Sequence, residues 1–506
     1  MKKHDYKFFD NYFISFLPLE NIMPIRNKNV KKPNIVILFA DDLGYGDLGC
    51  YGATKIPTPN VDSLAKKGLK FMDVHSSSAV CTPSRYSLLT GRYCWRTELK
   101  KWVIGGYGAP LIPRERPTIA SFLGDNGYRT AAIGKWHLGL WWPLKEGVKG
   151  PEAYNINRLG FELDCDYSKP IKGGPNELGF NYFFGIAGSL DMHPYCYIEN
   201  DHTVGIPDHY KEVLCNQQRK GLTTDNWKDE EVDIKCTEKS IAFIEDHLEN
   251  HSDKPFFLYH ATAAPHRPCE VRPDFVINKS QAGDRGDMVV LFDWVVGQIK
   301  DTLEKHDLMQ NTLLIITSDN GARLQCANGK TYGHKSCGEL KGQKADIWEG
   351  GHREPFIIIW PSVLKPNTTC HQLMCLSDLF ASISGIFGKE LPDNAAEDSF
   401  DLSSIFLGEQ NENKIRDTII HHSGGGIFSI RQGKWKLIQG LGSGGFSRPR
   451  KRKSYFWRPK GQLYDLEKDF KETNNLWKER PDIVKKLTDL LEKQIEQGFT
   501  REKKNK

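Results

Sequence analysis

Acidic and amide side chains follow two apolar stretches of the sequence. The stretch NIVILFA leads into Asp41 and Asp42, and the stretch LLIITS leads into Asp319 and Asn320. Functional residues of an open α/β sheet gather at the carboxyl ends of its strands, so we expect these four side chains to lie together. Three carboxylates and one amide oxygen form an all-oxygen ligand set that suits Ca²⁺ or Mg²⁺. Each pair alone would also fit a helix cap or a turn, so the predicted cation site depends on their combination.

Basic residues occupy similar places along the chain. Lys135 and His137 follow the strand-like stretch RTAAIG, and two residues apart in extended chain they point to the same side. The stretch PFFLYHATAAPH ends in His266, and Lys344 lies in a Gly-flanked loop. Taken singly, each lysine is an ordinary surface charge. Together with a hard cation, these lysines and histidines would bind and polarise a tetrahedral oxyanion.

Cys81 begins the stretch CTPSRYSLLTGRY, at the expected start of a helix. A buried, unreactive thiol is the simplest interpretation. A phosphatase with a thiolate nucleophile is the second, but its phosphate-binding loop needs a longer spacing than the three residues between Cys81 and Arg85. A soft thiolate is also a poor neighbour for an oxygen-ligated cation. A third possibility is that Cys81 is chemically altered in the mature protein.

The elements that must position these residues alternate between strand and helix patterns. Continuous apolar runs, such as the one from Asn34, are typical of strands buried on both faces. A helix is expected after Thr58, with Pro59 in its first turn and Gly68 as its stop, and another from about Thr118. This alternation predicts an α/β fold with a large, mostly parallel sheet sandwiched by helices. Further expected strands and one long helix lie at 255–266, 312–322, 356–361 and 288–306.

The pattern changes near residue 410. Short strand-like stretches joined by Gly-rich turns precede a helix-like stretch at 482–498, which predicts a smaller C-terminal antiparallel sheet with one helix. We therefore divide the chain into a poorly structured leader at 1–33, a catalytic domain at 34–410 and a C-terminal subdomain at 411–506.

Composition limits the classes of protein that fit. The chain has 506 residues and a net charge of only +5, which does not indicate a general polyanion binder, so no nucleic-acid partner is expected. No apolar run is long enough to predict a transmembrane segment. Asp10, Asn11 and Glu20 interrupt the short aromatic stretch near the N-terminus, which is therefore a poor secretion signal. The twelve cysteines have irregular spacing without a C-x-x-C pair, which argues against zinc ribbons.

The motifs of the chain, taken in order, resemble one enzyme family. They are ADDLGYGDLGCYG, CTPSR, GKWHLG, APHRP, TSDNGA, WEGGHREP and QLYDLEKDFKETNNL. CTPSR resembles the C-x-P-S-R signature of type I, formylglycine-dependent sulfatases, the arylsulfatase branch of the alkaline phosphatase superfamily. The resemblance runs from about Asn34 to the C-terminal helix. It implies an alkaline-phosphatase-like fold and a sulfuric ester hydrolase that removes sulfate from a sulfated carbohydrate.

The resemblance also implies a role for each candidate residue. A maturation enzyme would oxidise Cys81 to formylglycine (3-oxoalanine), an aldehyde that is hydrated in the resting enzyme. The cation, expected to be Ca²⁺ with Mg²⁺ as the alternative, would be held by five residues: Asp41, Asp42, Asp319, Asn320 and the modified Cys81. Arg85 would stabilise the hydrate and His137 would hydrogen-bond it. Lys135 and Lys344 would bind the sulfate oxygens, and His266 would face the leaving-group oxygen.

One family position differs in this chain. Ser189, in FGIAGSLDM, matches a serine that contacts sulfate, but Leu190 follows it where the family often has histidine. The surroundings of the sulfate are therefore expected to differ from the family pattern. The segment after it carries His193, Tyr195 and Tyr197, which either line the leaving-group pocket or form an ordinary surface loop.

Several alternatives stay open at this point. Relatives with the same signature cleave phosphonates or phosphodiesters, and a non-catalytic member would only bind sulfated glycans. Family analogy implies a periplasmic or secreted location, although the N-terminus gives no convincing signal. Conversion of Cys81 would leave eleven of the twelve cysteines, an odd number, so at least one would stay unpaired.

The loop GSGGFSRPRKRKSYFWRPKG is expected to be flexible and basic. Five cationic side chains lie between Arg448 and Lys453, and Tyr455, Phe456 and Trp457 follow them. One interpretation is a solvated hairpin tip. The other is a segment over the active-site mouth that binds further sulfates of a polyanionic substrate through a salt-sensitive field, while its aromatic rings stack on sugars.

Overall fold

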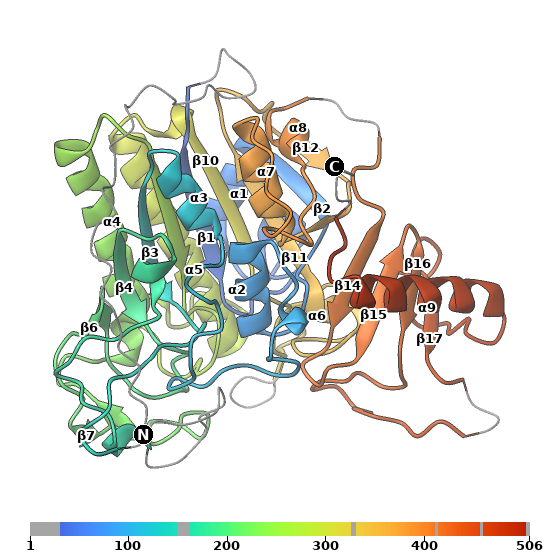
Figure 1. The fold of residues 1–506 in the computed structure, drawn as a ribbon, viewed down its shortest axis with the longest axis horizontal. Helices are drawn as coiled ribbons and strands as arrows, with labels where there is room; N and C mark the ends of the chain where they lie inside the picture. Colours follow the sequence, from blue (N-terminus) through green and yellow to red (C-terminus); the bar gives the residue numbers. More distant parts are fainter. Residues whose placement is uncertain (1–30, 149–160, 325–329, 410–412, 456–458, 502–506) are drawn as a thin grey trace, which may run out of the picture.

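A computed structural model describes residues 31–148, 161–324, 330–409, 413–455 and 459–501. Its main feature is a large mixed sheet (Figure 1). The strands follow one another across the sheet in this order: β12 (Thr368–Cys370), β2 (Leu69–His75), β11 (Arg353–Ile359), β10 (Thr312–Ser318), β1 (Asn34–Ala40), β9 (Phe256–Ala261), β3 (Arg129–Lys135), β4 (Tyr182–Ile186), β5 (Ile198–Glu199) and β6 (His202–Thr203), with β13 (Met374–Cys375) also paired to β2.

The centre of this sheet is parallel, as the sequence predicts. β1 pairs in parallel with β10 and β9, and β3 pairs in parallel with β9 and β4. β11, the expected strand FIIIWP, instead runs antiparallel to both β10 and β2. The carboxyl ends of β1, β3, β9 and β10 consequently meet at one edge of the sheet.

Helices cover both faces of the sheet because β1 is apolar on both sides. Ile35, Ile37 and Phe39 pack on one face, and Val36 and Leu38 pack on the other. The first face is covered by α2 (Cys81–Thr90), α3 (Ile119–Asp125) and α7 (Asp378–Ile386). The second is covered by α1 (Pro59–Lys67), α4 (Val232–Asn250) and α5 (Gly283–Lys305). This two-layered covering confirms the predicted α/β sandwich.

The helices expected after Thr58 and from about Thr118 begin where predicted, whereas the long helix expected at 288–306 begins earlier, at Gly283. Thr118 caps α3 through a reciprocal pair of hydrogen bonds with Ser121. Thr58 stands at the start of α1, but its hydroxyl accepts from the Gly49 N–H and donates to Asp62 instead of capping the helix. The short helices α6 and α8 span Glu349–His352 and Ser403–Phe406.

A four-stranded antiparallel sheet and one helix form the C-terminal part (Figure 1). The strands are β14 (Thr418–His422), β15 (Phe428–Gln432), β16 (Trp435–Ile438) and β17 (Gln462–Asp465), and the helix is α9 (Pro481–Glu496). Leu487 and Leu491 of α9 pack against Ile430 and Leu437 of this sheet. The predicted sheet-plus-helix is confirmed. The division of the chain at residue 410 stays a prediction, and most of the predicted leader lies outside the described residues.

The helices of the described ranges include none that is both long enough and apolar enough to cross a bilayer. A small hairpin of β7 (His209–Tyr210) and β8 (Leu222–Thr223) completes the regular elements.

The first half of the expected flexible loop is packed rather than free. The Ile347 N–H donates to the Ser443 carbonyl at 2.8 Å, and the Ser447 N–H donates to Asp346 at 3.0 Å. The Gly444 N–H donates to the Arg450 carbonyl, so the segment is a narrow turn with its tip between these residues. Phe456 and Trp457 lie outside the described residues.

Candidate active site

The sheet edge formed by β1, β3, β9 and β10 carries the residues that the sequence singles out. Asp41 and Asp42 follow β1 directly, and Asp319 and Asn320 follow β10. The two strand ends are adjacent because Ala40 pairs with Ser318 in the parallel ladder. The expected meeting of these four oxygen-bearing side chains therefore occurs in the structure.

Three oxygens of this group are buried and lack hydrogen-bond partners. Oδ1 of Asp41, Oδ2 of Asp42 and Oδ1 of Asn320 have none among the described residues. Asp319 is engaged instead, since its Oδ1 accepts from the Asp42 N–H at 3.1 Å and its Oδ2 accepts from Arg85 at 2.9 Å. Buried acceptors without donors are costly, so the site fits a hard cation that would take these oxygens as ligands.

Cationic side chains offset the negative charge of the cluster. Lys135 donates to Asp41, and Lys344 Nζ lies 2.6 Å from Asp42 Oδ1. Burial by itself would raise the pKa of Asp41. Lys135 and the other nearby cations have the larger combined effect and hold this pKa well below its ordinary value. Burial and the neighbouring Asp41 raise the pKa of Asp319 to about 7 despite Arg85. The carboxylates thus compete for a limited number of positive partners.

Arg85 connects the helix that begins at Cys81 to this cluster. It is fully buried, and it donates to the Lys135 carbonyl at 3.1 Å in addition to Asp319. Its guanidinium also lies 5.2 Å from the centre of the Phe39 ring. One turn of α2 therefore places Arg85 beneath the acidic cluster, with Cys81 at the helix start.

Cys81 lies within reach of the same groups. Lys344 Nζ is 3.3 Å from its sulfur, and one ligand atom each from Asp41, Asp42, Cys81 and His266 lies within 4.8 Å of the others. Burial raises the pKa of the Cys81 thiol to about 12, although Lys135 and Lys344 oppose the shift. A thiolate nucleophile is disfavoured by this environment, which argues against the thiolate phosphatase.

The two histidines approach the cluster from different loops. His137 Nε2 bonds to the Ile104 carbonyl at 2.7 Å, which leaves its buried Nδ1 without a hydrogen bond within the described chain. His266 Nε2 lies 3.7 Å from Asp42 Oδ2, and its Nδ1 bonds to the Arg267 carbonyl. Burial and Lys344 lower the pKa of His266 to about 4. His266 is therefore neutral at neutral pH until an anionic ligand raises its pKa.

Ser189 and its neighbours form a further wall of the site. The loop after β4 lies beside the loop after β3, since the His137 N–H donates to the Ala187 carbonyl at 3.1 Å. Ser189 is buried, and its hydroxyl has no partner in the part of the chain that is described. Leu190, which stands where the family often has histidine, packs in the core.

The tyrosines expected near the leaving group are core residues. Tyr195 and Tyr197 are buried against Trp227, and the Tyr195 hydroxyl donates to the Arg219 carbonyl. Neither ring is available to stack on a sugar, so neither interpretation of this segment describes the tyrosines. Only His193 is half-buried rather than buried.

Sequence reasoning missed two ion pairs behind the site. Arg267, next to His266, pairs with the buried Asp191 at 2.7 Å. Arg285 of α5 pairs with Asp47 and donates to the Asp42 carbonyl at 2.7 Å. Asp47, the last residue of the DLGYGD motif, is the sequence signal for the second pair. Nothing in the sequence links it to Arg285, which lies more than two hundred residues away.

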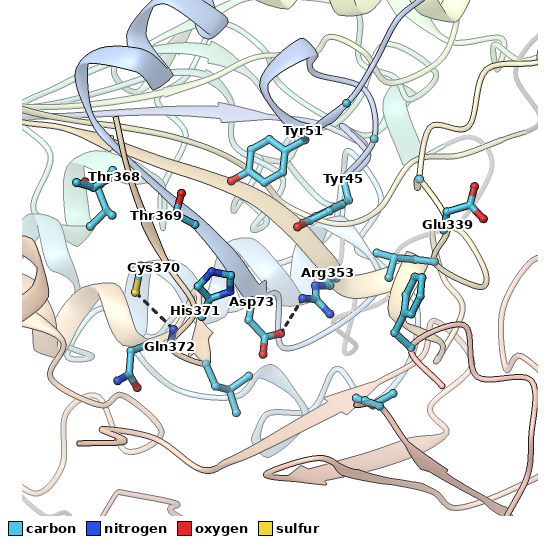
Figure 2. Close-up of a pocket in the computed structure, with 18 of the residues that line it drawn as sticks. Tyr45, Tyr51, Asp73, Glu339, Arg353, Thr368, Thr369, Cys370, His371 and Gln372 are labelled. Atoms are coloured by element: carbon cyan, nitrogen blue, oxygen red, sulfur yellow. Dashed lines mark hydrogen bonds and ion pairs between the residues drawn. The ribbon is translucent and has the colours of Figure 1, made fainter. Parts of the chain in front are cut away.

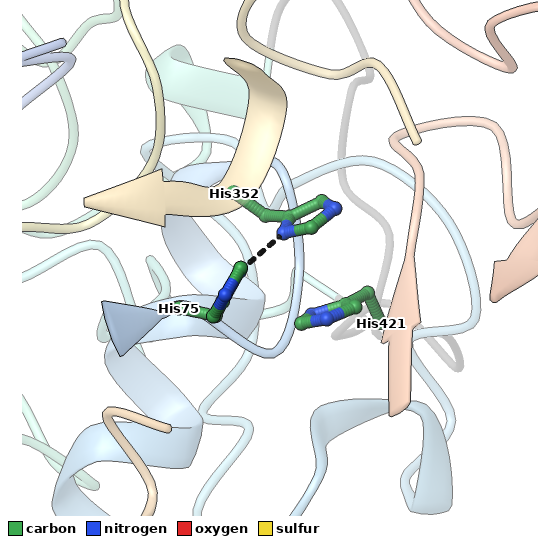
Figure 3. Close-up of side chains that lie close together, drawn as sticks. All are labelled: His75, His352 and His421. Atoms are coloured by element: carbon green, nitrogen blue, oxygen red, sulfur yellow. Dashed lines mark hydrogen bonds between the residues drawn. The ribbon is translucent and has the colours of Figure 1, made fainter. Parts of the chain in front are cut away.

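A second histidine cluster lies at the junction with the C-terminal sheet (Figure 3). His75 of β2, His352 of α6 and His421 of β14 are all buried, and His75 Nδ1 lies 3.0 Å from His352 Nδ1. The rings of His352 and His421 stack 3.8 Å apart at 15°. A bound metal lies near the plane of each imidazole, and two stacked rings cannot both point at one ion. The cluster is therefore packing between the two sheets.

A cavity lies beside the edge strands rather than at the acidic cluster. It has a volume of about 1350 Å³, and Tyr45, Asp73, Arg353 and Thr369 are among the side chains around it (Figure 2). Its described lining includes none of the predicted site residues. This cavity is therefore separate from the acidic cluster.

Comparison with known proteins places this geometry in a family. The Sulfatase family profile matches residues 33–389. The chain is 34% identical to an N-acetylgalactosamine-6-O-sulfatase of Bacteroides thetaiotaomicron over 94% of its own length and 95% of the relative. It is 33% identical to human arylsulfatase A, with 80% and 74% covered. A solved structure from a study of glycosaminoglycan metabolism in Bacteroides thetaiotaomicron superimposes with a TM-score of 0.77 at 32% identity, covering 91% of this chain and 99% of that one. The chain belongs to the sulfatase family, enzymes that hydrolyse sulfuric esters.

Proposed function

We propose that this sulfatase removes sulfate from a sulfated sugar of a glycan, with Cys81 converted to formylglycine and Ca²⁺ as the cation. The observation that carries the proposal is the set of buried oxygens of Asp41, Asp42 and Asn320 that accept no hydrogen bond from the described residues, with Asp41 and Asp42 close to Cys81. These acceptors suit a hard cation and are unsuited to a thiophilic one. A maturation enzyme that recognises the CTPSR motif is a required partner.

The absent groups would supply two kinds of chemistry. The hydrated aldehyde at position 81 would supply an oxygen nucleophile for sulfur, and the cation held by Asp41, Asp42, Asp319 and Asn320 would neutralise negative charge there. Every other contribution comes from side chains already in place.

The lysines and the arginine hold the anions. Lys135 and Lys344 contact Asp41 and Asp42, and Lys344 also contacts Cys81, so both ammonium groups lie where a sulfate group would meet position 81. Burial lowers the effective dielectric constant and strengthens their attraction for sulfate oxygens. Arg85 donates to Asp319 and so fixes the orientation of that carboxylate. Because Arg85 and position 81 are on the same helix, α2, this contact also fixes the position of residue 81.

The histidines and Ser189 handle protons and orientation. His137 presents an unpartnered Nδ1 within the described structure and would accept a proton from the hydrate. His266 would protonate the departing alcohol once the anionic ester raises its pKa from about 4. The Ser189 hydroxyl, buried without a partner among the described residues, would donate to a sulfate oxygen.

The relatives support a choice of substrate class. The Bacteroides thetaiotaomicron relative is named for N-acetylgalactosamine 6-sulfate, and the match spans nearly all of both chains. We therefore take that sugar sulfate as the first substrate to test. The alternative substrate is a phosphonate or a phosphodiester, because relatives with the same CTPSR-like signature cleave phosphorus esters.

The test is release of inorganic sulfate by protein produced together with a formylglycine-generating enzyme. Turnover of N-acetylgalactosamine 6-sulfate or another sugar sulfate, lost in Cys81→Ala without loss of folding, supports the proposal. Faster turnover of phosphonates or phosphodiesters than of any sulfate ester would overturn it.

A further inference from the structure

An exposed aromatic surface lies beside the proposed active site. Trp102 is 44% exposed, and the centre of its ring system is 5.8 Å from the half-buried ring of Phe446 at a tilt of 31°. The guanidinium of Arg323 lies 4.5 Å from the centre of the Phe446 ring. We call Trp102, Phe446 and Arg323 the aromatic platform. None of them has a role in the function proposed above.

Backbone hydrogen bonds tie Trp102 to the segment around Cys81. The Trp102 N–H donates to the Gly424 carbonyl at 2.8 Å, and the Gly424 N–H donates to the Ala345 carbonyl at 2.9 Å. The Ala345 N–H in turn donates to the Ala79 carbonyl at 2.6 Å. A Cβ added at Gly424 would lie 2.9 Å from the indole and 3.0 Å from the Ala345 methyl group. The indole and the Ala345 methyl group therefore both border Gly424, and Ala345 is the residue that follows Lys344.

Phe446 and Arg323 are fixed to the same loop. The Gln343 side chain donates to the Ser447 hydroxyl at 3.2 Å, next to Phe446. The Lys344 N–H donates to the Ala322 carbonyl at 2.9 Å, next to Arg323. The three platform residues come from separate parts of the sequence, yet each is one or two hydrogen bonds from the Lys344 loop.

The conformation of Trp102 shows that its exposure is built into the backbone. Its φ of 58° lies in the left-handed region, which is unfavourable for a bulky side chain. Such strain persists only where the surroundings impose it, and it concentrates at ligand-binding positions. The hydrogen bond to Gly424 supplies that constraint, and the result is an exposed indole held near the Lys344 loop.

The chemistry of the platform suits one ligand. Flat aromatic faces stack on the apolar faces of sugar rings, while Arg323 and the exposed Lys101 and Arg448 favour an anionic chain. We propose that the platform binds the sugar next to the sulfated sugar of an oligosaccharide. The inference rests on the proposed function and deepens it, because it makes a sulfated chain, rather than a free sulfated monosaccharide, the preferred substrate.

The experiment compares three substrates with four variants. The substrates are free N-acetylgalactosamine 6-sulfate and trisaccharides that carry this sugar at the non-reducing or the reducing end. Trp102→Ala and Phe446→Ala test the platform. Trp141→Ala is the matched control, since Trp141 is 48% exposed and bonds to Lys172 rather than to the Lys344 loop. Trp102→Phe keeps an aromatic ring, so its KM for the trisaccharides should stay close to that of the wild type.

We expect the KM for one of the trisaccharides to rise about three- to tenfold in both platform variants, with kcat unchanged, because aromatic contacts contribute on the order of 1 kcal/mol. The free monosaccharide should be hydrolysed as by the wild type. Equal losses on all substrates, or no loss on any, would overturn the inference.

Failure of the proposed function gives a different result. If the wild type hydrolyses no sulfate ester, calorimetry with Cys81→Ser and the same trisaccharides decides the matter. Binding that is weakened by Trp102→Ala and unaffected by Trp141→Ala would support the platform even then. Absence of binding, or binding that is independent of Trp102, would overturn it.

Discussion

Gly445→Ala perturbs the position of Lys344 without removing any functional group. A Cβ on residue 445 would lie 2.2 Å from the carbonyl carbon and oxygen of Ala345 and 2.6 Å from the Asp346 nitrogen. Ordinary contacts between such atoms are about 3.5 Å, so one of the two segments must retreat by about 1 Å. Neither partner is a flexible side chain, and the Ala345 backbone is tied to Ala79.

The size of the effect follows from that displacement. A misplacement of about 1 Å in a catalytic constellation costs up to about a hundredfold in rate, and overpacking costs about 1–3 kcal/mol of stability. We expect kcat/KM for a monosaccharide sulfate to fall by about ten- to a hundredfold if the Lys344 loop moves. If the loop at Phe446 moves instead, kcat/KM should fall for the oligosaccharide and stay unchanged for the monosaccharide.

The assay is sulfate release from both substrates, combined with thermal unfolding. Gly124→Ala is the control, because the nearest atom to its added Cβ is 3.9 Å away and the residue lies within α3. That variant should keep full activity and unfold at the same or a higher temperature. Wild-type activity on both substrates in Gly445→Ala would refute the view that this packing fixes Lys344.

Four further changes test other parts of the protein. Chelation should abolish turnover and Ca²⁺ should restore it, whereas Asp319→Ala should lose activity that no added ion recovers; recovery with zinc alone would contradict an oxygen-ligated site. His266→Ala should slow sugar sulfates far more than activated phenyl sulfates, which depart without a proton, and equal losses would indicate a positioning role. Neutralising Arg450, Lys451 and Arg452 should raise KM for a sulfated oligosaccharide and weaken the dependence of KM on added salt. If KM matches that of the wild type at every salt concentration, this basic segment is only a solvated surface.

The sequence predicts the sheet edge well because strand ends carry their own signals. Asp41 and Asp319 follow unbroken apolar runs, and the parallel pairing of those runs brings the two acids together. Cys81 and Arg85 need only a helix to be placed correctly relative to each other. Local patterns and the parallel topology are enough for this part of the site.

Long-range packing could not be predicted in the same way. Tyr195 and Tyr197 follow a loop-like segment, but Trp227 buries them against the sheet. The Gly-rich stretch before Phe446 suggested flexibility, yet its missing side chains allow the loop to lie directly on the Ala345 backbone. Glycine permits both freedom and close approach, and only the tertiary partner, here Ala345, distinguishes them.

The central claim is that Cys81 is the precursor of the nucleophile, and mass spectrometry of the peptide containing Cys81 tests it most directly. Protein should be prepared with and without a formylglycine-generating enzyme, and each sample assayed for sulfate release. We predict that sulfur is replaced by an aldehyde oxygen at position 81 and that activity rises in proportion to the converted fraction. A fully active preparation in which Cys81 is still an unmodified cysteine would contradict the account.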